Sequence, residues 1–315
     1  MPYPQLKTAI QTLGHTRALK DGSVRPHGFS FDFEEVTPII KAFRRMARGS
    51  EFDVSEMAMT TYLCARAAGK RITALPVFLV RAFHHGAVLH NAARGGFDPR
   101  ELEGERVGVN RGYTVTTGVW ARGVLQHEYG VDLSKITWVL SGDEHVAEFV
   151  PPSNVVRIEP GQELEQMLLS GEIAAATGLA TEHPDLKPLI PNAKEAGFAA
   201  LARDGYYPIN HTVVVRDELL EEHPQLAVDL FNAFAEAKRL YVARLRAADI
   251  LQPAAADLLY ARVMQVTGAD PLPYGMEPNR AMLEMVMRLA AEQGIISAPY
   301  PVGQLFAPGT LELTA

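Results

Sequence analysis

The sequence predicts an α/β protein that folds into two lobes. Short apolar stretches alternate with stretches of helical periodicity, which is typical of βαβ units and parallel sheets. A chain of 315 residues is long enough to form more than one hydrophobic core. Two turn-rich segments, 96–104 and 205–211, indicate where the chain passes between lobes. We therefore expect one lobe from 1–104 with 211–315, a second from 105–210, and a ligand cleft between them.

The strands are expected where apolar residues cluster over about four to eight positions. In the first half of the chain these ranges are 6–13, 29–33, 52–55, 72–77, 87–91, 106–109 and 136–140. In the second half they are 173–176, 187–190 and 212–215.

Helices are expected between these strands, over 37–48, 56–68, 116–129, 162–170 and 192–203. The first has Ile39, Phe43 and Met46 at helical spacing, and Gly49 is expected to end it. From 217 to 293 the chain is expected to be mostly helical, with a break at Pro224. A last helix over 280–293 precedes a proline-rich tail that is expected to be irregular.

Composition narrows the class of partner. Net charge is −7 and the isoelectric point is about 5.8, with no basic stripe, so a nucleic-acid partner is not expected. No stretch approaches the roughly 18 apolar residues that a membrane span needs. The start of the sequence does not resemble a secretory signal, so a cytoplasmic protein is expected. Its one cysteine, Cys64, is expected in the core. The expected partner is a small molecule, and a homo-oligomer is left open.

One segment places a cation and two imidazoles between two apolar strands. Arg81, His84 and His85 follow the strand expected over 72–77 and precede the one over 87–91. Arginine matches a carboxylate with two parallel hydrogen bonds, and histidine exchanges protons near neutral pH. The segment therefore predicts anion binding and proton transfer. In an extended chain adjacent residues point to opposite faces, so at most one histidine is expected to face the ligand.

A second candidate anion site lies in the loop 109–117. Gly112 permits a tight turn, and Thr116 or Thr117 is expected to cap the following helix. Free backbone N–H groups and the helix dipole at that point attract a carboxylate. Arg111 and Tyr113 belong to the same loop. The alternative is plain capping, with Arg111 in solvent.

The segment 53–56 resembles another strand-to-helix turn. Ser55 is expected to cap a helix that begins near Glu56. Asp53 and Glu56 are expected to have a structural role. The alternative is that they bind a substrate hydroxyl or orient a histidine.

Three further side chains are candidates for the cleft because of where they fall in the chain. His15 and Arg17 follow the first strand, where a surface role is the alternative. His211 stands at the expected return crossing, and its alternative is a structural histidine bonded to the backbone.

No metal or nucleotide motif supports a cofactor. The sequence contains no His-x-x-x-His pair, no GxGxxG and no phosphate-binding Walker loop, so no cofactor is expected. The alternative is a metal held by the histidine pair with Glu56 or His211 as third ligand.

Motifs along nearly the whole chain resemble the 4,5-dihydroxyphthalate decarboxylase family. They begin at Thr16-Arg-Ala-Leu-Lys-Asp-Gly, Glu51-Phe-Asp-Val-Ser-Glu-Met, Leu75-Pro-Val-Phe, Arg81-Ala-Phe-His-His and Gly118-Val-Trp-Ala-Arg-Gly-Val-Leu. They continue through Tyr206-Tyr-Pro-Ile-Asn-His, Pro273-Tyr-Gly-Met-Glu-Pro-Asn-Arg, Glu292-Gln-Gly and Leu305-Phe-Ala-Pro. The resemblance implies a type II periplasmic-binding-protein-like fold. The family pattern has arginine where this chain has His84, and an acidic residue where it has Arg111-Gly112.

The resemblance also implies a carbon–carbon lyase, cofactor-independent or metal-assisted. The expected reaction converts 4,5-dihydroxyphthalate to 3,4-dihydroxybenzoate and CO2 by protonation of the ring carbon, assisted by a para hydroxyl. Arg81 is expected to bind one carboxylate, and the Tyr113 loop with Thr116 and Thr117 the second. The proton at carbon is assigned to His85 or His84, with His85 preferred.

The remaining roles and the rival functions complete the hypothesis. His211 or Glu56 is expected to handle the substrate hydroxyl. The alternatives are a solute-binding protein for an aromatic or other organic acid, and a lyase acting on a related phenolic acid.

Overall fold

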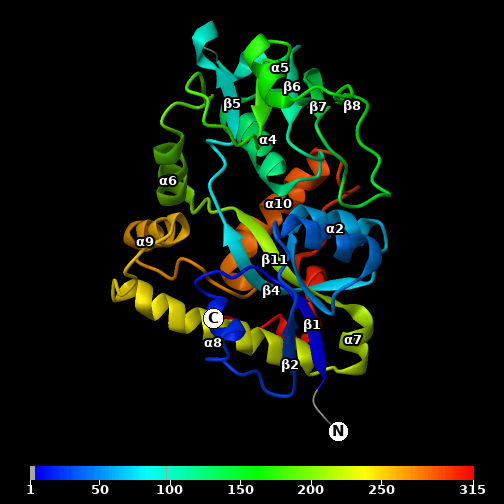
Figure 1. Cartoon of the computed structure of the whole chain (residues 1–315), viewed down its shortest axis with the longest axis vertical. Helices are drawn as coiled ribbons and strands as arrows, with labels where there is room; N and C mark the ends of the chain where they lie inside the picture. Colours follow the sequence, from blue (N-terminus) through cyan, green and yellow to red (C-terminus); the bar gives the residue numbers. More distant parts are fainter. Residues whose placement is uncertain (1–3, 97) are drawn as a thin grey trace. The chain divides into compact units, whose positions relative to one another are not determined.

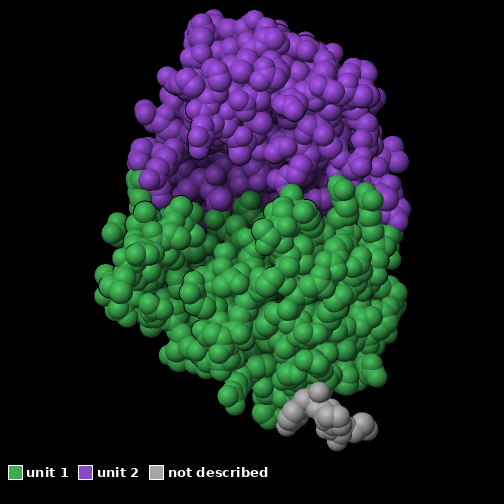
Figure 2. Space-filling view, viewed as in Figure 1, with its two compact units in different colours: residues 1–81, 209–284, 300–315 green, residues 82–208, 285–299 purple. Residues whose placement is uncertain are grey.

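The computed structural model describes residues 4–96 and 98–315 and divides into two compact units (Figure 2). Unit 1 contains the described residues up to Arg81, together with Ile209–Glu284 and Tyr300–Ala315. Unit 2 contains Ala82–Pro208 and Met285–Pro299. Two α/β units agree with the fold class that the sequence predicts.

Each unit is built on one mixed sheet (Figure 1). In unit 1 the strand order is β2-β1-β3-β11-β4, and in unit 2 it is β10-β5-β9-β6-β7-β8. The unit 1 strands are β1 Gln5–Ala9, β2 Ser30–Phe33, β3 Val54–Ala58, β4 Ile72–Arg81 and β11 Ile209–Arg216. The unit 2 strands are β5 Val88–Asn91, β6 Arg106–Val109, β7 Thr137–Leu140, β8 Val155–Arg157, β9 Ala175–Thr177 and β10 Leu186–Pro188.

Most of the expected elements are present, with shifted ends. The longer helices of the first two hundred residues are α2 Ile40–Gly49, α3 Met59–Ala67, α4 Thr116–Tyr129, α5 Leu164–Ser170 and α6 Ala193–Asp204. The C-terminal helices are α7 Asp217–Glu222, α8 Leu226–Arg246, α9 Ala255–Thr267 and α10 Arg280–Glu292. The short helix α1 Arg17–Lys20 and strand β8 were not expected.

The expectation of parallel sheets is only partly correct. Strand β11 runs antiparallel to β3 and β4, and β5 runs antiparallel to β9 and β10. Pairing with β11 also corrects the expected helix start at residue 56. Val213 lies opposite Glu56 in the ladder, so the chain stays extended through Ala58 and α3 begins at Met59.

The expected lobe boundaries are wrong at the first crossing. The chain leaves unit 1 after Arg81 and not near residue 104, because β5 pairs with β9 and β10 of the second sheet. The return lies after Pro208, two residues before the expected position. Residues 285–299 were expected in lobe 1 and belong to unit 2.

Helices cover both faces of the unit 1 sheet. Leu75, Val77 and Leu79 alternate along β4 and belong to one core with residues of α8. Between them Phe78 points to the other face, where its ring packs against Phe306 from the tail. Among the described helices none is long and apolar enough to cross a lipid bilayer.

A buried arginine links α4 to the end of α10 inside unit 2. Arg122 is fully buried, and its Nε donates to Oε1 of Gln293 at 2.7 Å. Its Nη2 donates to the carbonyl of Tyr113 at 2.7 Å, and the guanidinium lies 3.9 Å from the centre of that ring. This link explains why the residues after 284 join unit 2.

Removing the amide partner of Arg122 should destabilise the protein. We predict that Gln293→Leu lowers the free energy of unfolding by about 1–3 kcal/mol, because a buried charged donor loses its acceptor. Urea denaturation measures the change. The exposed Gln304→Leu is the control and should stay within about 0.5 kcal/mol of wild type. Equal stability of Gln293→Leu and wild type would show that the link contributes nothing.

Candidate functional site

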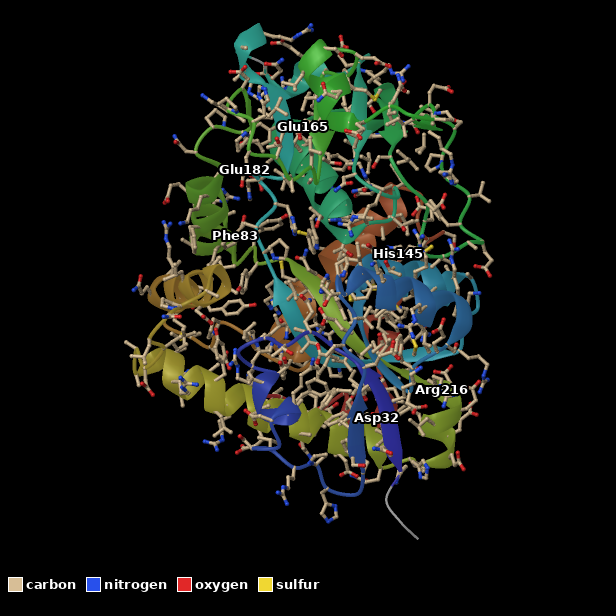
Figure 3. The ribbon with its side chains drawn as sticks, in the orientation of Figure 1. Asp32, Phe83, His145, Glu165, Glu182 and Arg216 are labelled. Atoms are coloured by element: carbon tan, nitrogen blue, oxygen red, sulfur yellow. The ribbon has the colours of Figure 1, made fainter. Side chains whose placement is uncertain are left out.

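Polar side chains gather at one edge of the unit 1 sheet. Strands β1, β3 and β4 end at this edge, and β11 begins there because it runs antiparallel to β3 and β4. This arrangement brings Gln11, Glu56, Arg81 and His211 to the same edge, although they are far apart in the sequence. Arg216, labelled in Figure 3, lies at the opposite end of β11.

A hydrogen bond at this edge joins a buried carboxylate to a histidine. Nδ1 of His211 lies 2.6 Å from Oε1 of Glu56. The Glu56 side chain is fully buried, whereas that of His211 is 17% exposed. Gln11 completes the carboxylate's surroundings, since its backbone N–H donates to Oε2 at 2.9 Å and its Nε2 donates to Oε1 at 2.7 Å.

These contacts determine where the protons lie. Burial by itself raises the pKa of Glu56, but the hydrogen bonds from His211 and Gln11 outweigh burial and lower it below the ordinary value. Glu56 is therefore a carboxylate that can only accept, so Nδ1 of His211 carries the proton. In the neutral ring Nε2 then carries no proton, and the ring also packs against Phe43 at 5.0 Å between centroids. A carboxylate that orients an imidazole in this way prepares it for acid–base catalysis.

A neutral amide positions the guanidinium of Arg81. Nη2 of Arg81 donates to Oδ1 of Asn279. The amide orientation follows from its own donors, because Nδ2 of Asn279 donates to the carbonyls of Pro273 at 2.9 Å and Gly275 at 2.7 Å. The motif that begins at Pro273 therefore serves to hold Arg81, a function that the sequence alone did not indicate.

His15 is buried, which contradicts its surface interpretation. It is 1% exposed and packs against the rings of Tyr241 and Tyr260 at 5.8 and 6.2 Å between centroids. Burial lowers the pKa of His15 from 6.5 to about 4, and the nearby Glu56 opposes this only in part. The ring is therefore neutral at neutral pH and is poorly suited to donate a proton there.

In unit 2 the anion site expected before α4 is filled by the protein itself. The backbone N–H groups of Tyr113 and Thr114 both donate to the carboxylate of Glu144, as does the hydroxyl of Thr114 at 2.6 Å. These donors are therefore not available to a substrate carboxylate. The expected capping by Thr116 or Thr117 is also wrong, because Val115 is the N-cap and no side chain caps the helix.

The close approach of Glu144 explains the glycine in this loop. A Cβ at Gly112 would lie 2.5 Å from Oε2 of Glu144, so a larger residue would push this carboxylate away from its donors. The left-handed turn is made by Arg111, at φ +74°, and not by Gly112 as expected. Arg111 is half-buried, which lowers its pKa, so it is not a solvated side chain.

The structure separates His85 from the residues before α4. His85 lies in a turn, so the alternation expected for an extended chain does not apply to it and His84. Its Nε2 lies 3.0 Å from Oε1 of Glu128, in the last turn of α4. Glu128 is twelve residues beyond Thr116, or about 18 Å along the helix, which is far more than one benzene ring spans. The contact with Glu128 therefore places the His85 ring beside the opposite end of α4 from Thr116.

The remaining candidates have mainly structural contacts. Ser55 is buried inside β3, where its hydroxyl donates to the carbonyl of Glu56, and it caps no helix. Asp53 accepts from the backbone N–H of Lys7 at 2.8 Å and pairs with Arg216, which fits the structural interpretation. Arg17 is exposed at the start of α1. His84 is buried.

The described residues contain no set of ligands for the alternative metal site. Within residues 4–96 and 98–315, no three His, Cys, Asp or Glu side chains lie close enough together to hold a metal ion.

Comparison with known proteins places the chain in a family. No model of a protein family matches it. It is 31% identical to the 4,5-dihydroxyphthalate decarboxylase of Comamonas testosteroni over an alignment of 325 residues, gaps included, which covers 98% of both chains. This chain belongs to the 4,5-dihydroxyphthalate decarboxylase family. It is also 33% identical, over 55% of its length and 69% of the other chain, to the enzyme of the same name from Pseudomonas putida.

Solved structures agree with the fold expected for a 4,5-dihydroxyphthalate decarboxylase family member. The aliphatic sulphonate-binding protein SsuA of Escherichia coli matches with a TM-score of 0.53, covering 99% of this chain and 100% of the other. The desulfurization enzyme DSZB matches with a TM-score of 0.52 over 96% of both chains. At 11% and 13% identity these matches establish the periplasmic-binding-protein fold alone.

Three site residues were missed by reasoning from the sequence. Asn279 lies in the motif that begins at Pro273, to which the sequence alone assigns no function. Gln11 follows a strand with no distinguishing pattern, and Glu144 follows β7 in the same segment as His145, labelled in Figure 3. Only Gly112, placed before a helix, gave a sign that a group approaches the backbone there.

Burial of neutral His15 should make stability depend on pH. As the pH is lowered, His15 takes up a proton near pH 6.5 in the unfolded chain and only near pH 4 in the folded protein. The free energy of unfolding should therefore decrease by about 3 kcal/mol when the pH is lowered from 6.5 to 4. We predict that His15→Phe removes this part of the pH dependence. Denaturation with urea at several pH values measures it, with the exposed His27→Asn as control. A variant with the wild-type slope would contradict the assignment.

Proposed function

We propose that this protein removes CO2 from a hydroxylated aromatic carboxylate, with 4,5-dihydroxyphthalate as the best candidate substrate and 3,4-dihydroxybenzoate as product. The main support is the similarity to a decarboxylase of that name over 98% of both chains. The paired Glu56 and His211 add a group suited to proton transfer, and Arg81 adds a cation suited to a carboxylate.

The proposed chemistry needs no external oxidant. An aryl carboxylate loses CO2 slowly because the electron pair of the breaking bond has no acceptor. A proton added to the ring carbon that bears the carboxylate, together with loss of the para hydroxyl proton, forms a dienone. The C–C bond then breaks and CO2 leaves, while the electron pair returns through the ring to the para oxygen, and the phenolate that forms regains the hydroxyl proton. The net change exchanges CO2 for one proton on the ring.

We assign the hydroxyl proton to His211. Nε2 takes this proton, and the carboxylate of Glu56 stabilises the imidazolium that forms. Glu56 is thus a positioning residue and not the base, because its own oxygens already accept from His211 and Gln11. Arg81, held by Asn279, binds the carboxylate that stays on the ring.

We assign the proton at the ring carbon to His84 in preference to His85. The support is the position of His85, whose ring contacts Glu128 at the C-terminal end of α4 and packs against Tyr206. The scheme uses no organic cofactor. A related phenolic acid would be converted by the same steps. The histidine at position 84, where the family pattern has arginine, favours such a different substrate.

The second candidate function is binding of an organic acid without chemistry. It is supported by the fold shared with SsuA, whose name describes a sulphonate-binding protein. Incubation with 4,5-dihydroxyphthalate separates the two functions, since a decarboxylase releases one CO2 for each molecule of 3,4-dihydroxybenzoate formed. Tight binding without CO2 would support the binding protein.

Substitution of His211 tests the assigned base. We predict that His211→Gln lowers kcat by about 10²–10⁴ while the substrate still binds, because a positioned acid or base contributes about that factor. The control is His85→Gln, which should keep kcat within a few-fold of wild type. Steady-state kinetics of CO2 release measure both. The reverse result, with His85→Gln inactive and His211→Gln active, would refute the assignment.

A further inference from the structure

A cavity of about 850 Å³ lies in unit 1, and its lining does not include the acid–base pair, although Glu56 is near enough to act on the pKa of the lining residue His15. Its walls come from residues 12–23, from helices α8 and α9 and from the segment between these helices. Small ligands occupy pockets of about 300–1,000 Å³, so the cavity has the size of such a site. The described residues that line it include His15 and do not include Glu56, Arg81 or His211.

Three rings form one wall of this cavity. His15, Tyr241 and Tyr260 pack against one another at 5.8 to 6.4 Å between centroids, with tilted or edge-on geometry. Neither ring nitrogen of buried His15 makes a hydrogen bond of good geometry with the described residues, although the carbonyl of Leu79 lies near enough to raise its pKa a little. Because the ring is neutral, it suits a neutral hydroxyl better than a charged group.

One charged side chain of the lining is available to a ligand. Asp257 accepts a hydrogen bond from the hydroxyl of Tyr241, and Asp21 accepts one from a backbone N–H at 2.9 Å. Arg244 pairs with a neighbouring aspartate at 3.8 Å. Arg17, exposed at the start of α1, makes no side-chain hydrogen bond or ion pair with the described residues, although its charge helps to lower the pKa of Asp21.

We propose that this cavity is a second binding site, for a hydroxylated aromatic monocarboxylate. The carboxylate binds Arg17, the aromatic ring lies against Tyr241 and Tyr260, and a ring hydroxyl bonds to His15. The ligand class follows from the residues that line the cavity. The choice of 3,4-dihydroxybenzoate as the ligand rests on the proposed function, since it is the proposed product.

Titration calorimetry with 3,4-dihydroxybenzoate and with catechol tests the proposal. Arg17→Gln should weaken one binding event of 3,4-dihydroxybenzoate roughly tenfold and leave that of catechol unchanged, because catechol has no carboxylate. Ala256→Trp, which adds a bulky side chain to the lining of the cavity, should abolish that event for both compounds. The matched controls are Arg25→Gln and Ala255→Trp, exposed positions that do not line the cavity.

Two results would overturn the proposal. One is binding of 3,4-dihydroxybenzoate to both Arg17→Gln and Ala256→Trp with wild-type affinity, which would show that the compound binds elsewhere. The other is an equal loss of affinity in a variant and in its matched control. A CO2 assay on wild type and Ala256→Trp is run separately, so absence of decarboxylation would refute the proposed function and leave the binding result intact.

Discussion

The hydrogen bond between Glu56 and His211 is the interaction on which the candidate site depends. Removing a carboxylate from water costs several kcal/mol, so a buried carboxylate needs donors that are fixed in place. Here the donors come from His211 and from both the backbone and the side chain of Gln11. This set of hydrogen bonds therefore requires the loop after β1, strand β3 and the start of β11 to be correctly placed together.

The same requirement explains the mixed sheet of unit 1. His211 lies at the start of β11, and a parallel β11 would carry it to the opposite edge from Arg81. The antiparallel strand thus joins two distant parts of the sequence at one edge. A buried carboxylate with its polar partners contributes little net stability compared with apolar packing, so the presence of Glu56 is better explained by the histidine ring that it orients.

Unit 2 shows how a recognisable signal can be misassigned. The loop before α4 has the features of an anion site, and it does bind an anion, but that anion is Glu144 of the same chain. Strand-to-helix turns offer the same N–H donors to an internal carboxylate as to a ligand. The sequence predicts the donors correctly and cannot show which acceptor reaches them, because Glu144 is some thirty residues away.

The fold was largely predictable, and the site only in part. The sequence pattern located α4 and β6 to the residue, and α4 is long enough to show a clear helical periodicity. Pairing partners and strand direction depend on tertiary contacts, so the antiparallel β11 and the early crossing after Arg81 were missed. Residue type together with position in the chain made Glu56 and His211 candidates, whereas nothing in the sequence around Gln11 and Asn279 indicates that their amides contact Glu56 and Arg81.

The protonation of His211 tests the central claim most directly. Long-range ¹H–¹⁵N correlation spectra of histidine-labelled protein, assigned by comparison with His211→Gln, report which ring nitrogen carries the proton. The structure predicts a proton on Nδ1 at neutral pH, donated to the carboxylate of Glu56. A neutral ring with its proton on Nε2 would contradict the account, because Nδ1 and an ionised Glu56 could then not share a hydrogen bond.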